Sequence, residues 1–197
     1  SGRPLSEIRD EIGIEHDSFV YLNIGRLDPQ KNHAAMIAAF RELAIKEKDV
    51  CIIFVGIGSH EDRIKASAEQ SGVSDRIFFL GRRSDIGDLL ALADVYVFPS
   101  FFEGLPVALI EAMSQSLPCI SSEIRVVQEV MVNNESGLLI DPGSVDDLVA
   151  AMNELFKNRE LRERLGRNAH RVAMEKFSIS ANVTKWEDMY KTIAAQH

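Results

Sequence analysis

Residues 95–113 of the chain read VYVFPSFFEGLPVALIEAM: an apolar run, a loop with Gly and Pro, and a largely apolar helical segment. This order predicts a buried strand followed by a helix, the repeating unit of a parallel α/β sheet. Two carboxylates bracket the turn, Glu103 before it and Glu111 about two turns into the helix. A helix N-terminus attracts anions, and carboxylates accept hydrogen bonds from sugar hydroxyls. The stretch therefore predicts a site for a sugar joined to a phosphate.

The same alternation of strands and helices extends along most of the chain. Short continuous apolar runs, typical of parallel strands covered on both faces, alternate with segments of helical period. The predicted strands are residues 19–24, 50–55, 77–80, 95–98, 119–121 and 138–140. The predicted helices are residues 34–43, 62–71, 85–92, 105–116, 145–156 (capped by Ser144), 159–177 and 179–195. We therefore expect an α/β fold with a Rossmann-like, doubly wound, parallel six-stranded sheet and C-terminal helices.

The domain organisation follows from the absence of repeats, low-complexity segments and internal linkers. We expect one domain over residues 1–177 and a C-terminal helix over residues 178–197, capped by Ser178. In such sheets the ligands lie beyond the carboxyl ends of the strands, at the topological switch point. The chemistry is therefore expected in the loops that follow the strands. Because the chain begins at Ser1 without a methionine, we expect it to be trimmed from a longer protein.

Composition and charge exclude some classes of partner. The chain carries 22 basic and 30 acidic residues, a net charge of −8, which argues against a nucleic-acid-binding protein and a strongly basic membrane-surface protein. No apolar run is long enough to span a membrane and no signal peptide is visible, so we expect a cytoplasmic protein. The two cysteines, Cys51 and Cys119, lie in apolar runs and are expected to be buried, reduced thiols.

The loop after the first predicted strand carries two cations just before a helix. Gly25 allows close approach of the backbone, while Arg26 and Lys31 could together hold a diphosphate. The alternative is a pair of solvated surface cations. His33 follows at the start of the helix, and we assign it no catalytic role.

Two further loops are weaker signals for a ligand. Gly56 and Gly58 follow the second strand, but the third glycine of a dinucleotide fingerprint is missing. This loop could approach a nucleotide or sugar, or it could be only a tight turn. After the third strand, the Gly81-Arg82 loop could contact a base, or Arg82 could be a surface arginine.

The two glutamates of the loop at residues 99–106 also have a plain alternative reading. Glu103 could be a solvated loop acid, and Glu111 could be a surface residue of the helix. The helix around Glu111 is largely apolar, however, and a buried acid is costly unless it has a partner. We therefore favour a binding role for both. We predict no metal site in this chain.

Taken in order, these motifs resemble a known family, over about residues 20–177. They resemble the C-terminal, donor-binding domain of retaining GT-B glycosyltransferases, of the glycosyl transferases group 1 or family 4 type. Glu103 and Glu111 match the E-x7-E motif of that family. The other matching segments are Gly25-Arg26-Leu27, Lys31-Asn32, Val55-Gly56-Ile57-Gly58, Leu80-Gly81, Glu111-Ala112-Met113, Leu117-Pro118 and Ser136-Gly137-Leu138-Leu139.

The resemblance implies roles for the site residues. Arg26 and Lys31 would hold the diphosphate and stabilise the leaving group without a metal, and Glu103 would hold the hydroxyls of the donor sugar. Donor contacts would also come from Gly25, Gly58, Arg82, Gly104, Leu105, Pro106 and, at the ribose, Glu111. The sequence departs from the family pattern at Ser116, where glycine is usual, and at residues 125–129, where a Gly-Gly pair is missing before Glu129.

The resemblance also implies that half of the enzyme is missing. The acceptor site would lie on an N-terminal domain, toward which the last helix, around Trp186 and Tyr190, would pack. We therefore expect a hexosyltransferase fragment that is inactive alone. Its donor would be a UDP- or GDP-sugar and its acceptor a glycan or a lipid-linked sugar, with no cofactor and with peripheral membrane association of the whole protein left open. The alternatives are a non-catalytic nucleotide- or sugar-phosphate-binding module and a GT-B enzyme of another class, such as a phosphorylase or an epimerase.

Overall fold

The computed structural model describes residues 2–178 together with Val183, Trp186 and Lys191. The helix expected over residues 178–197, including Tyr190, therefore lies almost wholly outside the described residues. Of the two aromatic side chains predicted to pack toward another domain, Trp186 is described and is exposed.

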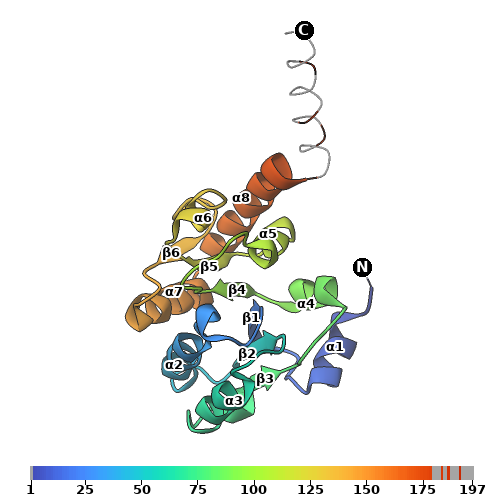
Figure 1. Cartoon of the computed structure of the whole chain (residues 1–197). Helices are drawn as coiled ribbons and strands as arrows, with labels where there is room; N and C mark the ends of the chain where they lie inside the picture. The colour runs from blue at the N-terminus through green and yellow to red at the C-terminus, as the bar shows by residue number, and fades with distance from the viewer. Residues whose placement is uncertain (1, 179–182, 184–185, 187–190, 192–197) are drawn as a thin grey trace.

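A six-stranded, fully parallel sheet forms the centre of the domain, as the sequence predicts. Its strands are β1 (Phe19–Ile24), β2 (Val50–Val55), β3 (Ile77–Phe79), β4 (Val95–Phe98), β5 (Cys119–Ser122) and β6 (Leu138–Ile140). They lie in the order β3-β2-β1-β4-β5-β6 (Figure 1). The chain thus winds outward in one direction from β1 and then in the other from β4. The strand pair β1–β4 is the switch point of the sheet.

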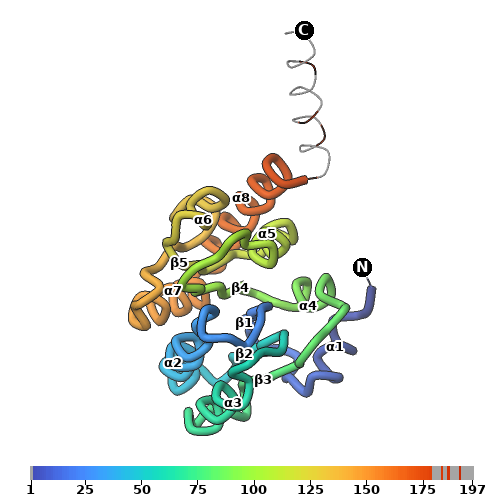
Figure 2. The backbone as a smooth tube through the Cα atoms, viewed as in Figure 1, coloured from blue at the N-terminus to red at the C-terminus, as the bar shows by residue number. Residues whose placement is uncertain are grey.

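Helices cover both faces of the sheet. The helices longer than one turn are α1 (Leu5–Ile12), α2 (His33–Ala44), α3 (Glu61–Glu69), α4 (Ile86–Leu92), α5 (Val107–Ser114), α7 (Val145–Lys157) and α8 (Arg159–Phe177), and α6 (Arg125–Gln128) is a single turn. One apolar cluster packs α2, α3 and α7 on one face, and a second packs α1, α4 and α5 on the other (Figure 1). The helix α8 contributes to both clusters, and its contact with α5 is visible in Figure 2.

Local sequence explains most of the element boundaries. The predicted strands are confirmed to within one residue, and the N-cap role of Ser144 is confirmed because its hydroxyl accepts a hydrogen bond from the Asp147 amide at 3.1 Å. The two cysteines are confirmed as buried, free thiols.

The prediction that a helix starts at residue 105 is wrong, because α5 begins at Val107. Leu105 precedes a proline, which disfavours helical backbone, and Pro106 has a ψ of 61°. Leu105 and Pro106 therefore belong to the loop that follows β4. This lengthens the irregular backbone at the switch point.

Two helices, α1 and α6, were not expected from the sequence. The single turn of α6 is too short for a helical period, and α1 is mostly polar, with Ile8 as its only buried residue. Ser116, which replaces the usual glycine, has a φ of 63°, a left-handed conformation that favours glycine. Ser116 adopts this turn without changing the fold. The carbonyl of Ser116 lies only 2.1 Å from the position that a Cβ would take on Gly166, so α8 packs very closely here.

Candidate functional site

Two loops at the switch point are joined to each other. The loop after β1 contains Gln30 and Lys31, and the loop after β4 contains residues 99–106. The amide of Phe101 donates to the Gln30 carbonyl at 2.9 Å, and the Gln30 side-chain amide donates to the Phe102 carbonyl at 2.6 Å. The Lys31 ammonium donates to the Glu103 carboxylate at 2.6 Å. Gln30 was not identified from the sequence, because its role depends on a loop 72 residues away.

The Lys31–Glu103 ion pair is largely removed from solvent. The side chains are 14% and 7% exposed, and the Lys31 ammonium also lies 5.0 Å from the centroid of the Phe98 ring. A charge in such a position is costly without a partner, so each residue holds the other in place. The structure thus brings together the cation predicted for a diphosphate and the carboxylate predicted for a sugar. An ammonium has three donors, so Lys31 can bind an anionic ligand while it keeps Glu103.

The second predicted cation, Arg26, lies in the same loop but is open to solvent. Its side chain is 73% exposed and its guanidinium pairs with the Asp28 carboxylate at 3.2 Å. Asp28 in turn accepts hydrogen bonds from the Ser59 hydroxyl at 2.8 Å and the Ser59 amide at 3.0 Å. These hydrogen bonds, and then the charge of Arg26, lower the pKa of Asp28. The sequence analysis missed Asp28, although a carboxylate between two predicted cations could have drawn attention to it.

A cavity of about 480 Å³ opens where β1, β2 and β3 end. The predicted residues Gly25, Arg26 and Arg82 line it, together with Gly56 and Ile57. The neighbouring Arg83 also lines it, but its guanidinium is held by Asp85 and Glu11, both at 2.6 Å. Arg82 makes no hydrogen bond or ion pair with any residue that the structure describes. The cavity therefore offers one uncommitted guanidinium near the loop that carries Arg26.

The two glycines after β2 allow this loop to pack against the loop after β1. Gly56 has a φ of 136°, and a Cβ there would lie 2.0 Å from the Gly25 carbonyl oxygen. A Cβ on Gly58 would lie 2.4 Å from the Leu27 carbonyl oxygen. Both glycines are thus required by backbone packing within the chain. Direct contact of Gly58 with a donor stays a prediction.

The remaining predicted residues lie in the loop after β4 and on α5. Gly104, Leu105 and Glu111 are exposed and Pro106 is buried. The argument that Glu111 would be costly in an apolar helix is wrong, because its side chain lies on the exposed side of α5. A second cavity, of about 300 Å³, adjoins Glu103 and is also lined by Phe102, Arg125 and Glu129. Glu103 and Glu111 are therefore in different environments, one enclosed and one open.

No cluster of three or more His, Cys, Asp or Glu side chains that could hold a metal ion occurs among residues 2–178 and the three later described positions. No helix in this described part is long and apolar enough to cross a membrane.

Comparison with known families and structures gives the family and the fold of the chain. The family model "Glycosyl transferases group 1" matches residues 6–172. An Escherichia coli UDP-Gal:alpha-D-GlcNAc-diphosphoundecaprenol alpha-1,3-galactosyltransferase is 31% identical over 91% of this chain, which covers 47% of that protein. The putative glycosyltransferase EpsD of Bacillus subtilis is 31% identical over 95% of this chain, which covers 50% of it. The chain thus spans about half the length of these relatives.

Solved structures show the same fold. The Anabaena protein HepE, crystallised with UDP and glucose, superposes with a TM-score of 0.86 at 24% identity, over 98% of this chain and 53% of that protein. The C-terminal domain of the group 1 protein LpcC from Francisella tularensis superposes with a TM-score of 0.79 at 20% identity, over 91% of this chain and 95% of that domain. The fold of this chain is therefore one Rossmann-like half of a GT-B architecture.

Proposed function

This chain belongs to the glycosyl transferases group 1 family, and from that premise we propose that it is the donor-binding half of a retaining, metal-independent glycosyltransferase. The transferred group is a hexosyl unit and the donor is a UDP- or GDP-sugar. The observation that carries the proposal is the enclosed Lys31–Glu103 pair, which joins the two loops at the switch point of the sheet. A ligand that contains both a diphosphate and a sugar suits this combination of a cation and a carboxylate.

The chemistry expected of the two cations is electrostatic. When the bond between the sugar and the diphosphate breaks, negative charge grows on the leaving phosphate oxygens. Lys31 is fixed before the ligand arrives, and it supplies positive charge without any rearrangement of solvent. Arg26 is exposed, and it turns from Asp28 toward the second phosphate. Glu103 accepts hydrogen bonds from the sugar hydroxyls and so fixes the anomeric carbon.

The other predicted residues have supporting roles in this proposal. The cavity lined by Gly25 and Arg82 takes the base, and Glu111 accepts the ribose hydroxyls. The backbone at Gly104, Leu105 and Pro106 lies against the sugar and phosphate, with Gly58 keeping the neighbouring loop close. The UDP in the HepE structure and the UDP-sugar in the name of the galactosyltransferase support a uridine donor.

The acceptor half of the reaction lies outside this chain in the proposal. The acceptor is a glycan or a lipid-linked sugar bound by an N-terminal domain, which would close over the donor and exclude water. The diphosphoundecaprenol acceptor in the name of the Escherichia coli relative supports a lipid-linked acceptor, which would place the whole protein at a membrane surface. The 197-residue chain alone is therefore expected to bind its donor weakly and to transfer almost no sugar.

Calorimetric titration of the 197-residue chain with UDP, GDP and ADP tests the donor site. We expect one nucleotide to bind selectively, and Arg26→Ala to weaken it about tenfold through loss of a charge-assisted contact. Arg159→Ala is the matched control, because Arg159 is also exposed and ion-paired but lies at the start of α8. Circular dichroism confirms that each variant is folded.

Two results would overturn the proposal. The donor role fails if no nucleotide binds to the folded chain, alone or mixed with the N-terminal half of the full-length protein. The proposal that the acceptor is bound outside this chain fails if the chain alone transfers sugar at the rate of the full-length protein.

A further inference from the structure

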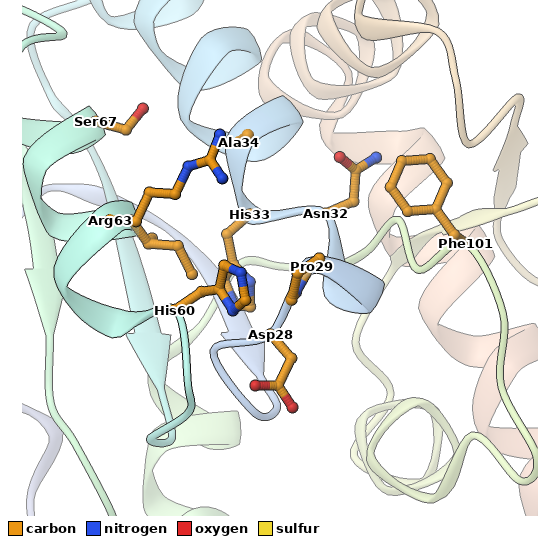
Figure 3. A pocket seen from close by; sticks show the side chains of 10 residues that line it. Asp28, Pro29, Asn32, His33, Ala34, His60, Arg63, Ser67 and Phe101 are labelled. Carbon is orange, nitrogen blue, oxygen red and sulfur yellow. The ribbon is translucent and has the colours of Figure 1, made fainter.

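A separate cavity of about 360 Å³ opens on the face of the sheet covered by α2 and α3. The donor-side cavity is lined by Ile24, Val55 and Ile86, which pack with the cluster on the other face. The loop after β1 lies between the two cavities. The residues that line the cavity of about 360 Å³ are Asp28, Pro29, Asn32, His33, Ala34, His60, Arg63, Ile64, Ser67 and Phe101 (Figure 3).

Arg63, on α3, is exposed to solvent and brings to this cavity a guanidinium with no partner among the described residues. Every other arginine except Arg82 makes an ion pair or a hydrogen bond within the described part of the chain. Arg82 lines the proposed base pocket and Arg63 lines this one. In Figure 3 the Arg63 side chain extends toward the start of α2, on the Ala34 side of the cavity. Each of these two cavities is therefore lined by one guanidinium group that has no partner among the described residues.

His33 is a second polar group that the fold leaves unused. Its side chain is 2% exposed, and neither ring nitrogen meets hydrogen-bond geometry with a described residue, although the Asp28 backbone lies close enough to raise the pKa of the ring. The ring packs against Phe54, with centroids 5.3 Å apart and an interplanar angle of 65°. A leucine would fill this space without burying two unsatisfied nitrogens, so packing alone does not account for a histidine. Because His33 lines the cavity, a ligand there could supply the missing partner.

The chemistry of the lining selects the class of ligand. Pro29, Ala34, Ile64 and Phe101 give the cavity an apolar wall, and Arg63 gives it a cation. The only carboxylate of the lining, Asp28, already accepts from Ser59 and pairs with Arg26, so it is not free to hold a cation. We propose that this cavity binds a small organic anion, whose carboxylate or phosphate faces Arg63 and His33 while its apolar body lies against the apolar wall. This cavity is distinct from the proposed base pocket, and Asp28 connects the two because it pairs with Arg26 and lines this cavity.

Benzoate is the probe, because it combines a carboxylate with an apolar ring of suitable size. Benzoate is titrated into the full 197-residue chain labelled with ¹⁵N, and the backbone and histidine ring signals are followed by NMR. We expect saturable shifts at His33, His60 and Arg63, and none at Gly104 or Glu111. Benzamide has the same shape without the charge, and it should bind at least about tenfold more weakly.

Two variants separate a binding role from a structural one. Arg63→Gln should weaken benzoate about tenfold, whereas Arg82→Gln should leave benzoate binding unchanged and weaken the nucleotide. His33→Leu should abolish the benzoate shifts at Arg63 while raising the melting temperature of the chain. The proposal is overturned if benzoate produces no saturable shifts, if benzamide binds equally well, or if Arg63→Gln binds as the unaltered chain does. A lower melting temperature for His33→Leu would also overturn it, because His33 would then be serving the fold.

Discussion

The two sides of the loop after β1 differ in whether their enclosed polar groups have partners. On the donor side, the enclosed Lys31 and Glu103 satisfy each other at 2.6 Å. On the side covered by α2 and α3, His33 is equally enclosed but has no partner, and Arg63 is unpaired among the described residues. A few residues of one loop thus separate a satisfied site from an unsatisfied one.

This difference suggests how each side would respond to a ligand. The proposed donor side is already organised, so a diphosphate would enter a prearranged field and gain from an existing cation. The other side stores an unfavourable arrangement that a ligand could relieve. On the proposed donor side, removing a charged group should therefore lower stability, whereas on the other side, removing the unsatisfied histidine should raise it. Four tests examine this contrast.

Removing the cation on the donor side should have the largest effect. Lys31→Ala leaves Glu103 enclosed without a partner, and we expect a loss of about 3–5 kcal/mol in the free energy of unfolding. Denaturant titration measures the loss. Arg26→Ala is the control, and it should leave the denaturation midpoint nearly unchanged because Arg26 is 73% exposed. A midpoint for Lys31→Ala equal to that of the unaltered chain would mean that the donor side is not held by this pair.

The pH dependence of stability should reveal the unsatisfied side. Burial lowers the pKa of His33 from 6.5 to about 4, against the opposing influence of the nearby Asp28 backbone; Lys31 also lowers the pKa of His33. Between these values the unfolded chain binds the proton that the folded chain excludes. The contribution of neutral His33 to the free energy of unfolding is therefore fully present above about pH 6.5. It is lost as the pH falls toward 4, by about 3 kcal/mol in total.

His33→Leu isolates this contribution from the carboxylates that titrate in the same range. Asp28, His60, Lys31 and Arg63 surround the site and remain in the variant. Denaturant titrations of both proteins at several pH values between 4 and 7.5 give the difference. The variant should gain stability relative to the unaltered chain as the pH falls. Parallel curves for the two proteins would show that His33 is not a buried, neutral group.

Replacing each of the two unpaired arginines in turn should show that the two cavities bind their ligands separately. Arg63→Gln should weaken benzoate about tenfold and leave the nucleotide unchanged, and Arg82→Gln should do the reverse, each change amounting to about 1.4 kcal/mol. NMR titration and calorimetry measure the two affinities on the same samples. If one variant weakened both ligands equally, the two cavities would be a single site and the contrast between the sides would be lost.

The smallest effect is expected at the residue that both sides share. Asp28 pairs with Arg26 toward the donor side and lines the cavity of Arg63. Asp28→Asn removes one negative charge near both ligands, so both affinities should rise, by about twofold after screening by salt. Calorimetry with the nucleotide and with benzoate measures both changes. A rise on one side only would show that Asp28 acts through one of its neighbours and not through its charge.

Much of the fold could be predicted because each strand has its own apolar run. The six strands, their parallel arrangement and the helices between them follow from local periodicity. The single turn of α6 could not be predicted because so short a segment has no measurable period. The environment of Glu111 was misjudged for a related reason, since the composition of a helix does not say which side of it faces solvent.

The chain sequence by itself determined the class of fold and the family, and it pointed to the loops in which we propose the chemistry. Those features depend on residue types and on spacings of a few residues, which are fixed along the chain. Only the tertiary structure decided which charges are paired, because Lys31 meets Glu103 and Gln30 meets Phe102 across 72 residues. It also decided that His33 is enclosed without a partner and that Arg63 lies beside it. Burial and pairing depend on contacts between distant segments, and no local pattern records them.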